Sequence, residues 1–129
     1  MEYKRKIFGY ECDIYGHLNN ANYLHLYEEA RADALEQMKM PVRKFAEFGY
    51  HIYITNIELK FIIGLPLESK VIIKSEIESS NRLQSTWIQE IYNEAGQLCN
   101  RAIVKGAFVK GGKPTRLTKE LFEIFKADK

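Results

Sequence analysis

The sequence predicts an α+β fold in which a five-stranded antiparallel sheet wraps around one long central helix. Three observations support this prediction. The chain of 129 residues has the length of a single domain, 1–129. One segment has helical periodicity, and four later segments with strand periodicity are joined by short turns, which favours antiparallel pairing. The apolar side of the helix must be buried, and one face of the sheet is the available surface.

The first half of the chain is expected to hold one strand, a polar loop and the long helix. β-Prone Tyr, Ile and Phe residues predict a strand over residues 3–10. In the helical segment, 21–38, apolar residues recur at spacings of three and four, and Pro41 ends the pattern. Asn19 or Asn20 is a suitable N-cap for this helix. The apolar stripe of the helix comprises Tyr23, Tyr27, Ala30, Ala34 and Met38.

Strand patterns fill most of the second half. They cover residues 51–63, 70–78, 83–92 and 97–110, and a short helix is expected over 117–125. Short turns rich in Gly, Asn and Ser separate these segments, so we expect an antiparallel sheet. Strict alternation along the first of these strands places one set of side chains on a single face: Tyr53, Thr55, Ile57, Leu59, Phe61 and Ile63.

Composition argues against several classes of protein. The formal net charge is only +2, whereas nucleic-acid binding needs a concentrated basic patch. The cluster Lys4-Arg5-Lys6 is expected to be a solvated strand edge. Cys12 and Cys99 have no paired spacing, which predicts reduced thiols and a cytoplasmic protein. No apolar region follows the N-terminus and no apolar run approaches about 20 residues, so we expect neither a signal peptide nor stable membrane insertion.

The histidines do not predict a metal site. The spacing of His17 and His25 is not typical of metal ligands, and His51 is isolated from other candidate ligands. We therefore expect no bound metal.

The polar loop before the helix carries the residues that suggest chemistry. Asp13, Gly16 and His17 precede the helix start near Asn20. The first N–H groups of a helix have no intrahelical partner and carry partial positive charge, so they can stabilise an oxyanion on a carbonyl substrate. A carboxylate nearby suggests acyl transfer or hydrolysis, by general base or by direct attack. The simpler interpretation of the same residues is an ordinary turn and helix cap.

A longer motif extends this segment. Residues 13–23 read Asp-Ile-Tyr-Gly-His-Leu-Asn-Asn-Ala-Asn-Tyr, and Tyr27-Glu28-Glu29-Ala30-Arg31 follows. This pattern, on a chain of this length and order of elements, resembles the 4-hydroxybenzoyl-CoA thioesterase-like branch of the hotdog-fold acyl-CoA thioesterase superfamily. The resemblance implies a hotdog fold and an enzyme that hydrolyses a thioester to a free acid and CoA.

The resemblance also implies roles for individual residues. Asp13 falls on the catalytic aspartate, which acts as general base or nucleophile, and the backbone N–H of Asn20 falls where the family polarises the thioester carbonyl. His17 is a further candidate catalytic residue, and orienting Asp13 is its alternative role. The remaining matches, expected to bind the substrate or to shape the site, are Gly16, Asn19 and Tyr23.

The resemblance implies partners as well. CoA enters as part of the substrate, and no other cofactor is implied. Homodimers or homotetramers are typical of the family, with the acyl pocket between subunits. Arg82, at the start of the fourth strand, is a candidate for binding CoA phosphates because Arg suits phosphate oxygens, and a solvated surface is its alternative.

The sequence departs from the family pattern in two places, of which the first leaves the carrier and the mechanism open and the second is expected only to change a turn. Tyr15 stands where plant acyl-carrier-protein thioesterases of similar pattern have asparagine, and Leu-Glu-Ser at 67–69 replaces the Gly-Asp that often opens the third strand. An acyl-carrier-protein thioester is therefore an alternative substrate. A non-catalytic acyl-CoA-binding protein also stays open. A hotdog dehydratase is the nearest enzyme alternative, and the motif disfavours it because those enzymes place their His and acidic residue differently. A Cys12 nucleophile paired with His17 also stays open, although a lone cysteine at a strand end is more often a small buried hydrophobic residue.

Overall fold

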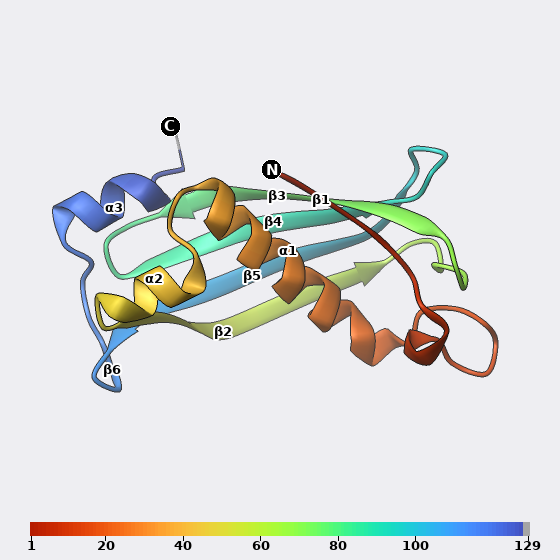
Figure 1. Ribbon diagram of the computed structural model, residues 1–129, viewed down its shortest axis with the longest axis horizontal. Coiled ribbons are helices and arrows are strands. Elements are labelled where there is room, and N and C mark those ends of the chain that lie inside the picture. The colour runs from red at the N-terminus through yellow and green to blue at the C-terminus, as the bar shows by residue number, and fades with distance from the viewer. Residues whose placement is uncertain (128–129) are drawn as a thin grey trace.

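One curled antiparallel sheet wraps around the long helix α1, Tyr23–Gln37 (Figure 1). The structure is a computed structural model that describes residues 1–127, and within that range six strands pair in the order β1-β3-β4-β5-β2, with β6 on β5. The strands are β1 Glu2–Lys6, β2 Tyr50–Phe61, β3 Lys70–Ser80, β4 Gln84–Tyr92, β5 Leu98–Lys110 and β6 Lys113–Pro114. The shorter helices are α2 Val42–Glu47 and α3 Lys119–Phe125, and two 3-10 turns are η1 Gly9–Glu11 and η2 Asn20–Asn22.

The predicted α+β fold is confirmed, with α1 lying across the concave face of the sheet (Figure 1). The sixth strand, β6, has two residues, too few for alternation to predict. Six residues of α1 are buried under the sheet: Tyr23, Leu26, Tyr27, Ala30, Ala34 and Leu35. Met38, expected in the apolar stripe, is only half-buried because it caps the C-terminus of the helix.

A β-bulge in β2 changes which side chains share a face of that strand, compared with the prediction. The register against β5 shifts between Ile54 and Asn56. One extra residue reverses the alternation, so side chains on either side of the bulge share the face toward the core. Ile52 and Ile57 therefore both pack against the core, whereas Tyr53 is 62% exposed. The prediction that Tyr53 and Ile57 share one face is wrong.

The first strand is shorter than predicted. β1 ends at Lys6, and the expected continuation to residue 10 is wrong because η1 begins at Gly9. The turn is closed from both sides: the Glu11 N–H donates to the Phe8 carbonyl at 3.0 Å, and the Glu11 carboxylate accepts the Phe8 N–H at 3.0 Å. A side chain that binds backbone in this way competes with strand formation.

Aromatic packing closes one end of the sheet. Phe45 of α2 contacts Tyr50 and Phe125, with ring centroids 5.5 and 5.3 Å apart, and Phe108 contacts Phe125 at 5.1 Å. Helix α2 was not predicted because its six residues are too few to show helical periodicity. The loop that carries Asp13 lies at the opposite end of the molecule (Figure 1).

Candidate active site

The Asp13 loop is a closed turn between η1 and η2. Cys12 and Leu18 form an isolated antiparallel bridge at its base. Inside it, the Asp13 N–H donates to the His17 carbonyl at 2.9 Å and the Gly16 N–H donates to the Asp13 carbonyl at 3.1 Å. Gly16 has φ +78°, a left-handed conformation that costs little only for glycine. The loop therefore has a defined shape set by its own backbone.

The two oxygens of the Asp13 carboxylate differ in their hydrogen bonding. Its Oδ1 accepts the Tyr15 N–H at 2.9 Å and the His17 N–H at 3.4 Å. Its Oδ2 has no hydrogen-bond partner within residues 1–127, and the side chain is half-buried. Backbone donors thus orient the group, and one oxygen is left to accept a proton or to attack a carbon.

The loop is docked onto residues 62–69. The Leu18 N–H donates to the Leu65 carbonyl at 2.8 Å, and the Gly16 carbonyl accepts the Leu67 N–H at 2.9 Å. The His17 ring lies against Gly64, where an added Cβ would approach the ring Cδ2 to 3.0 Å. The ring Nδ1 lies 3.2 Å from the Tyr15 carbonyl oxygen. His17 thus contacts both the loop and the segment that supports it.

The helix start next to this loop has an available donor. The Asn19 Oδ1 accepts the Ala21 N–H at 3.0 Å, so Asn19, one of the two predicted caps, caps the 3-10 turn η2 that leads into α1. The prediction that Asn19 or Asn20 caps the long helix itself is wrong, because the N-cap of α1 is Asn22, which makes no side-chain cap hydrogen bond. Asn20 is the first residue of η2, and its N–H has no acceptor inside the helix. The Asn22 side chain donates to the Glu11 carbonyl at 2.8 Å, which ties the helix start to the beginning of the loop.

The Asp13 charge contributes to the raised pKa values of two neighbouring side chains, Tyr23 and Cys12. Burial raises the pKa of the Tyr23 phenol, and Cys99 and then Asp13 raise it further. Tyr23 is 3% exposed and packs edge-on against Phe61, with ring centroids 5.0 Å apart. Burial, then Asp13, then Glu11 raise the pKa of the Cys12 thiol. A raised pKa leaves less of the Cys12 thiolate at neutral pH, which disfavours the alternative of a cysteine nucleophile.

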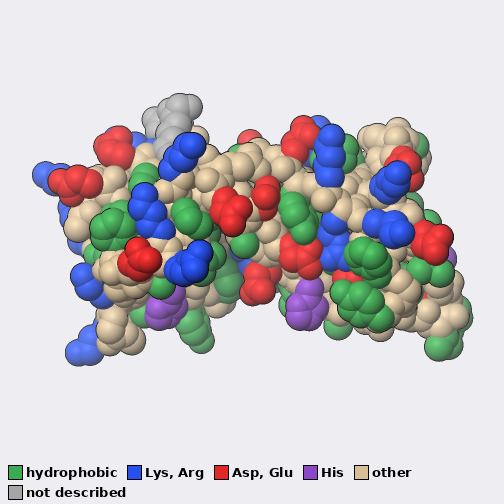
Figure 2. Space-filling view, viewed as in Figure 1, with side chains coloured by type: hydrophobic (Ala, Val, Ile, Leu, Met, Phe, Trp, Pro, Cys, Tyr) green, Lys and Arg blue, Asp and Glu red, His purple; other side chains and the backbone are tan. Residues whose placement is uncertain are grey.

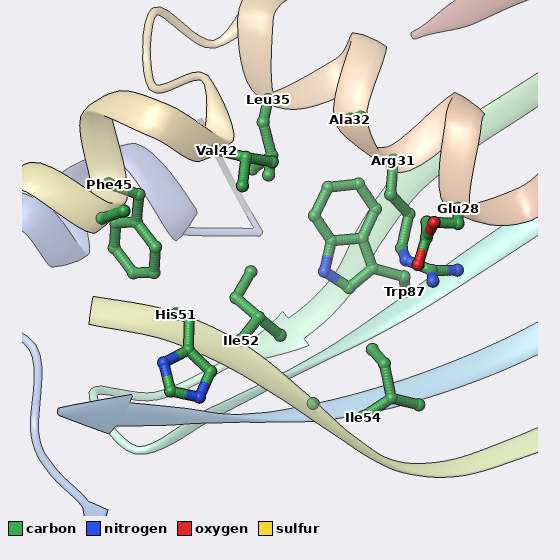
Figure 3. Close-up of a pocket in the computed structure, with 12 residues that line it drawn as sticks. Glu28, Arg31, Ala32, Leu35, Val42, Phe45, His51, Ile52, Ile54 and Trp87 are labelled. Carbon is green, nitrogen blue, oxygen red and sulfur yellow. The ribbon is translucent and has the colours of Figure 1, made fainter. Parts of the chain in front are cut away.

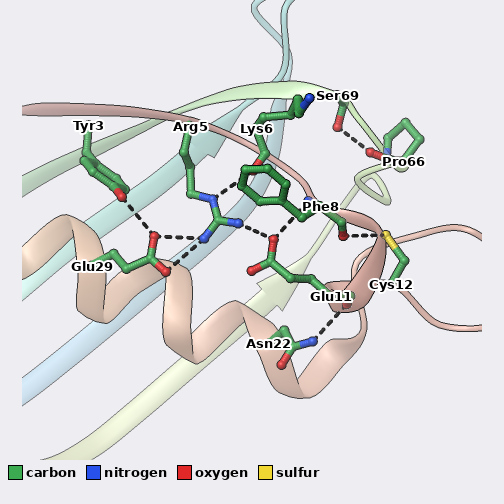
Figure 4. Close-up of polar contacts among 10 residues, drawn as sticks. All are labelled: Tyr3, Arg5, Lys6, Phe8, Glu11, Cys12, Asn22, Glu29, Pro66 and Ser69. Carbon is green, nitrogen blue, oxygen red and sulfur yellow. Dashed lines mark hydrogen bonds and ion pairs between the residues drawn. The ribbon is translucent and has the colours of Figure 1, made fainter.

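An ion-pair network at the root of the loop was not predicted from the sequence (Figure 4). Glu11 is 4% exposed and pairs with Arg5, which also donates to both carboxylate oxygens of Glu29 at 2.8 and 2.9 Å. Tyr3 donates to the same carboxylate at 2.9 Å. Burial disfavours the charged guanidinium and so acts to lower the pKa of Arg5. Glu29 and then Glu11 outweigh this effect, and the pKa of Arg5 is raised.

This network corrects the expectation for the basic cluster at residues 4–6. Lys4 and Lys6 are exposed as expected, but the Arg5 side chain is only 9% exposed and points toward α1. The alternating direction of side chains in β1 is the one signal that could have separated Arg5 from its neighbours. Its partner Glu29 lies 24 residues away in sequence, too far to be identified by spacing, and the contact with Glu11 depends on the turn that brings Glu11 back to β1.

A pocket of about 410 Å³ lies between α1, α2 and β2 (Figure 3). Arg31 and Glu28 project into it from α1, next to Trp87 (Figure 3). Burial lowers the pKa of the Arg31 guanidinium, while Glu28 opposes this, and Arg31 donates to Gln89 Oε1 at 2.9 Å. Most of the lining is apolar, from Leu35, Val42, Phe45, Ile52, Ile54 and Trp87. Asp13 does not line this pocket.

Arg82 is separated from the other predicted site residues. It precedes β4, at the end of the sheet opposite the Asp13 loop (Figure 1), and its Nε donates to the Leu117 carbonyl at 2.7 Å. The residues that the structure does bring together at the loop and the helix start are Asp13, Gly16, His17, Asn19, Asn20 and Tyr23.

Apolar side chains surround this end of the molecule. Ile14 and Tyr15, which directly follow Asp13, are 92% and 79% exposed. Figure 2 shows hydrophobic side chains gathered at the same end, next to basic groups. Across residues 1–127, no group of His, Cys, Asp and Glu is arranged to hold a metal, and no helix is long and apolar enough to span a membrane.

Known proteins are similar to this chain in sequence and in fold. A model of the Thioesterase-like superfamily matches residues 9–125. The long-chain acyl-CoA thioesterase FadM of Escherichia coli (strain K12) is 30% identical over 105 residues, which are 81% of this chain and 79% of that protein. A crystal structure of a hypothetical protein from Aquifex aeolicus has a TM-score of 0.93 and 25% identity, covering 98% of this chain and 99% of that one.

A further neighbour, DHNA-CoA thioesterase from Staphylococcus aureus, has a TM-score of 0.91 and 23% identity, over 96% of this chain and 87% of that one. At this identity it shows the fold alone. The predicted hotdog fold and the predicted thioesterase enzyme are confirmed, whereas the 4-hydroxybenzoyl-CoA thioesterase-like branch stays a prediction. Because the family model matches most of its length, the chain belongs to the Thioesterase-like superfamily.

Proposed function

We propose that this protein hydrolyses an acyl-CoA thioester, with Asp13 as its catalytic carboxylate and the backbone N–H of Asn20 as donor to the thioester carbonyl. The main support is that one short loop carries a carboxylate oxygen that has no hydrogen-bond partner within residues 1–127, and leads into a turn whose first N–H, that of Asn20, has no acceptor inside that turn. The bridge between Cys12 and Leu18 returns the chain from Asp13 to the helix start.

Asp13 acts in one of two ways. As general base, its Oδ2 removes a proton from water, and the water oxygen attacks the carbonyl carbon. As nucleophile, Oδ2 attacks that carbon itself, and water then hydrolyses the resulting anhydride. In both cases the Asn20 N–H faces the developing oxyanion. The C–S bond breaks and CoA leaves as a thiolate. In the general-base route the thiolate takes the proton that Asp13 gained, and in the nucleophile route it takes one from the water that opens the anhydride, so the Asp13 carboxylate is restored and the acid is released.

The other residues of the loop support this chemistry. His17 orients the turn through its ring contacts with Tyr15 and Gly64, and acts on Asp13 through the backbone. Asn19 fixes the helix start by capping it. Tyr23, buried and neutral, forms an apolar wall beside Asp13.

The substrate class follows from the relatives and from the pocket. FadM is named for long-chain acyl-CoA and the Staphylococcus aureus neighbour for DHNA-CoA, so both names specify a CoA thioester. The pocket beside α1 has a mostly apolar lining that suits a hydrocarbon or aryl acyl group (Figure 3). An acyl-carrier-protein thioester is the alternative substrate, and CoA phosphates are the predicted ligand of Arg82.

Two copies of the chain complete the site in this proposal. β2 is an edge strand, with Tyr53 and Phe61 62% and 51% exposed. Antiparallel pairing of β2 with the β2 of a second copy would set the end of one strand, beside the Asp13 loop, next to the start of the other. That start, at Ile52 and Ile54, lines the pocket. A gel-filtration mass of one chain would contradict this arrangement.

A thiol-release assay over a panel of acyl-CoA thioesters tests the proposed activity. We expect release of free CoA from the wild-type protein, saturable in substrate and unaffected by a metal chelator. The same acyl groups on acyl-carrier protein distinguish the two carriers. Saturable binding of acyl-CoA without thiol release would contradict the proposal and favour a non-catalytic binding protein.

A further inference from the structure

Glu11 holds both ends of the Asp13 loop. Through its carboxylate it binds the Phe8 N–H and Arg5, and so fixes the chain that leads into Asp13 two residues later. Through its carbonyl it accepts the Asn19 N–H at 3.0 Å and the Asn22 side chain at 2.8 Å, and so fixes the helix start. One residue therefore sets the position of the carboxylate relative to the helix N–H.

Arg5 connects this anchor to the rest of the fold. Its planar guanidinium donates in several directions at once, which suits it to bridge two carboxylates. It binds Glu29 of α1 through two hydrogen bonds and Glu11 of η1, while its own backbone belongs to β1 (Figure 4). Strand, turn and helix are thus joined by a single side chain whose exposed fraction is 9%.

We infer that Arg5 and Glu11 are positioning residues, which hold Asp13 and the Asn20 N–H at the separation that attack on the thioester carbonyl requires. This inference rests on the proposed function. Neither side chain touches substrate; both act through the backbone of residues 11–22. A misplacement of the order of 1 Å in a reacting group can lower a rate by about 100-fold.

The experiment compares Glu11→Gln with a matched control, Glu90→Gln. Glu90 also pairs with an arginine, Arg101, at 3.6 Å, but this pair joins two sheet strands, β4 and β5, and does not join a strand to the loop. We expect Glu11→Gln to lower kcat about 10- to 100-fold with KM nearly unchanged, at a temperature where circular dichroism shows it folded. Glu90→Gln is expected to keep both kinetic constants.

A double mutant separates positioning from a purely structural role. If Glu11 acts through Asp13, Glu11→Gln lowers kcat in the wild-type background but not in the Asp13→Asn background. Should Glu11→Gln fail to fold, Arg5→Lys keeps the charge but loses the guanidinium fork, and the same drop in kcat is expected from it. A folded Glu11→Gln or Arg5→Lys variant whose kcat stays within about twofold of wild type overturns the inference.

The two proposals fail in different ways. If Asp13→Asn leaves kcat unchanged, the proposed function is wrong whatever Glu11→Gln does. If Asp13→Asn abolishes activity while folded Glu11→Gln retains it, Asp13 remains the catalytic group and only the positioning role is lost.

Discussion

Gly16 and Gly96 offer a matched test of whether the shape of the Asp13 loop matters for catalysis. Both have φ +78°, and within residues 1–127 an added Cβ would meet no atom within 4 Å at either position, apart from those of the glycine and its two chain neighbours. Gly16 lies in the Asp13 turn, whereas Gly96 lies in the turn between β4 and β5. Substitution by alanine therefore imposes the same conformational cost at the two sites without a steric clash.

The expected loss of stability is about 1 kcal/mol for each variant. A left-handed conformation costs a non-glycine residue about 1–2 kcal/mol. Alanine also restricts the unfolded chain, which offsets about 0.4–1 kcal/mol of this cost. For a domain of this size the melting temperature is expected to fall by about 4 °C. Thermal unfolding followed by circular dichroism measures this for both variants.

Activity is expected to separate the two variants. The Gly16 N–H binds the Asp13 carbonyl, and the Gly16 carbonyl binds Leu67, so relaxation of this residue moves the catalytic carboxylate. We expect Gly16→Ala to lower kcat by about tenfold or more, and Gly96→Ala to keep it. Equal kcat values for the two variants would refute the link between loop geometry and catalysis. An unchanged melting temperature would refute the conformational reasoning.

Three further predictions concern single side chains. Asn19→Ala removes the helix cap and is expected to lower the free energy of unfolding by about 1 kcal/mol in urea titration; no change would contradict the cap. Tyr27→Phe removes the 2.6 Å hydrogen bond to Asn100, whose Nδ2 has no partner within residues 1–127. Leaving that amide wholly unpaired is expected to cost about 1–3 kcal/mol, and a loss below about 0.5 kcal/mol would contradict this. Because its thiol pKa is raised, Cys12 is expected to react with iodoacetamide slowly at pH 7 and faster as the pH rises, and Cys12→Ser is expected to retain activity; an inactive, folded Cys12→Ser would favour the cysteine nucleophile.

The parts of the fold that periodicity specifies were predicted from the sequence. Helix α1 was predicted because its apolar residues recur on one side, and β3 to β5 because alternation and turn residues agree. Asn19 was one of two predicted caps, because a short polar side chain before a helical turn has a local partner, and it caps η2, the turn before α1. These signals lie within a few residues of one another.

The features that were missed depend on contacts between distant segments. The bulge in β2 is set by its register against β5, so the alternation that placed Tyr53 with Ile57 does not reveal it. The burial of Arg5 depends on Glu29, 24 residues away, and on the turn that brings Glu11 back to β1. Nothing in the sequence around Arg82 indicates that its side chain binds the Leu117 carbonyl.

The most direct test of the central claim is the turnover of Asp13→Asn. Asparagine keeps the size of the side chain and an oxygen for the Tyr15 N–H, but it can neither accept a proton from water nor attack the carbonyl. Asp33→Asn, on the outer part of α1 where the carboxylate binds Gln37, is the matched control. With an acyl-CoA that wild type hydrolyses, kcat of Asp13→Asn is expected to fall by about 10²–10⁴-fold while Asp33→Asn stays at the wild-type rate. A folded Asp13→Asn protein with wild-type turnover would contradict the account.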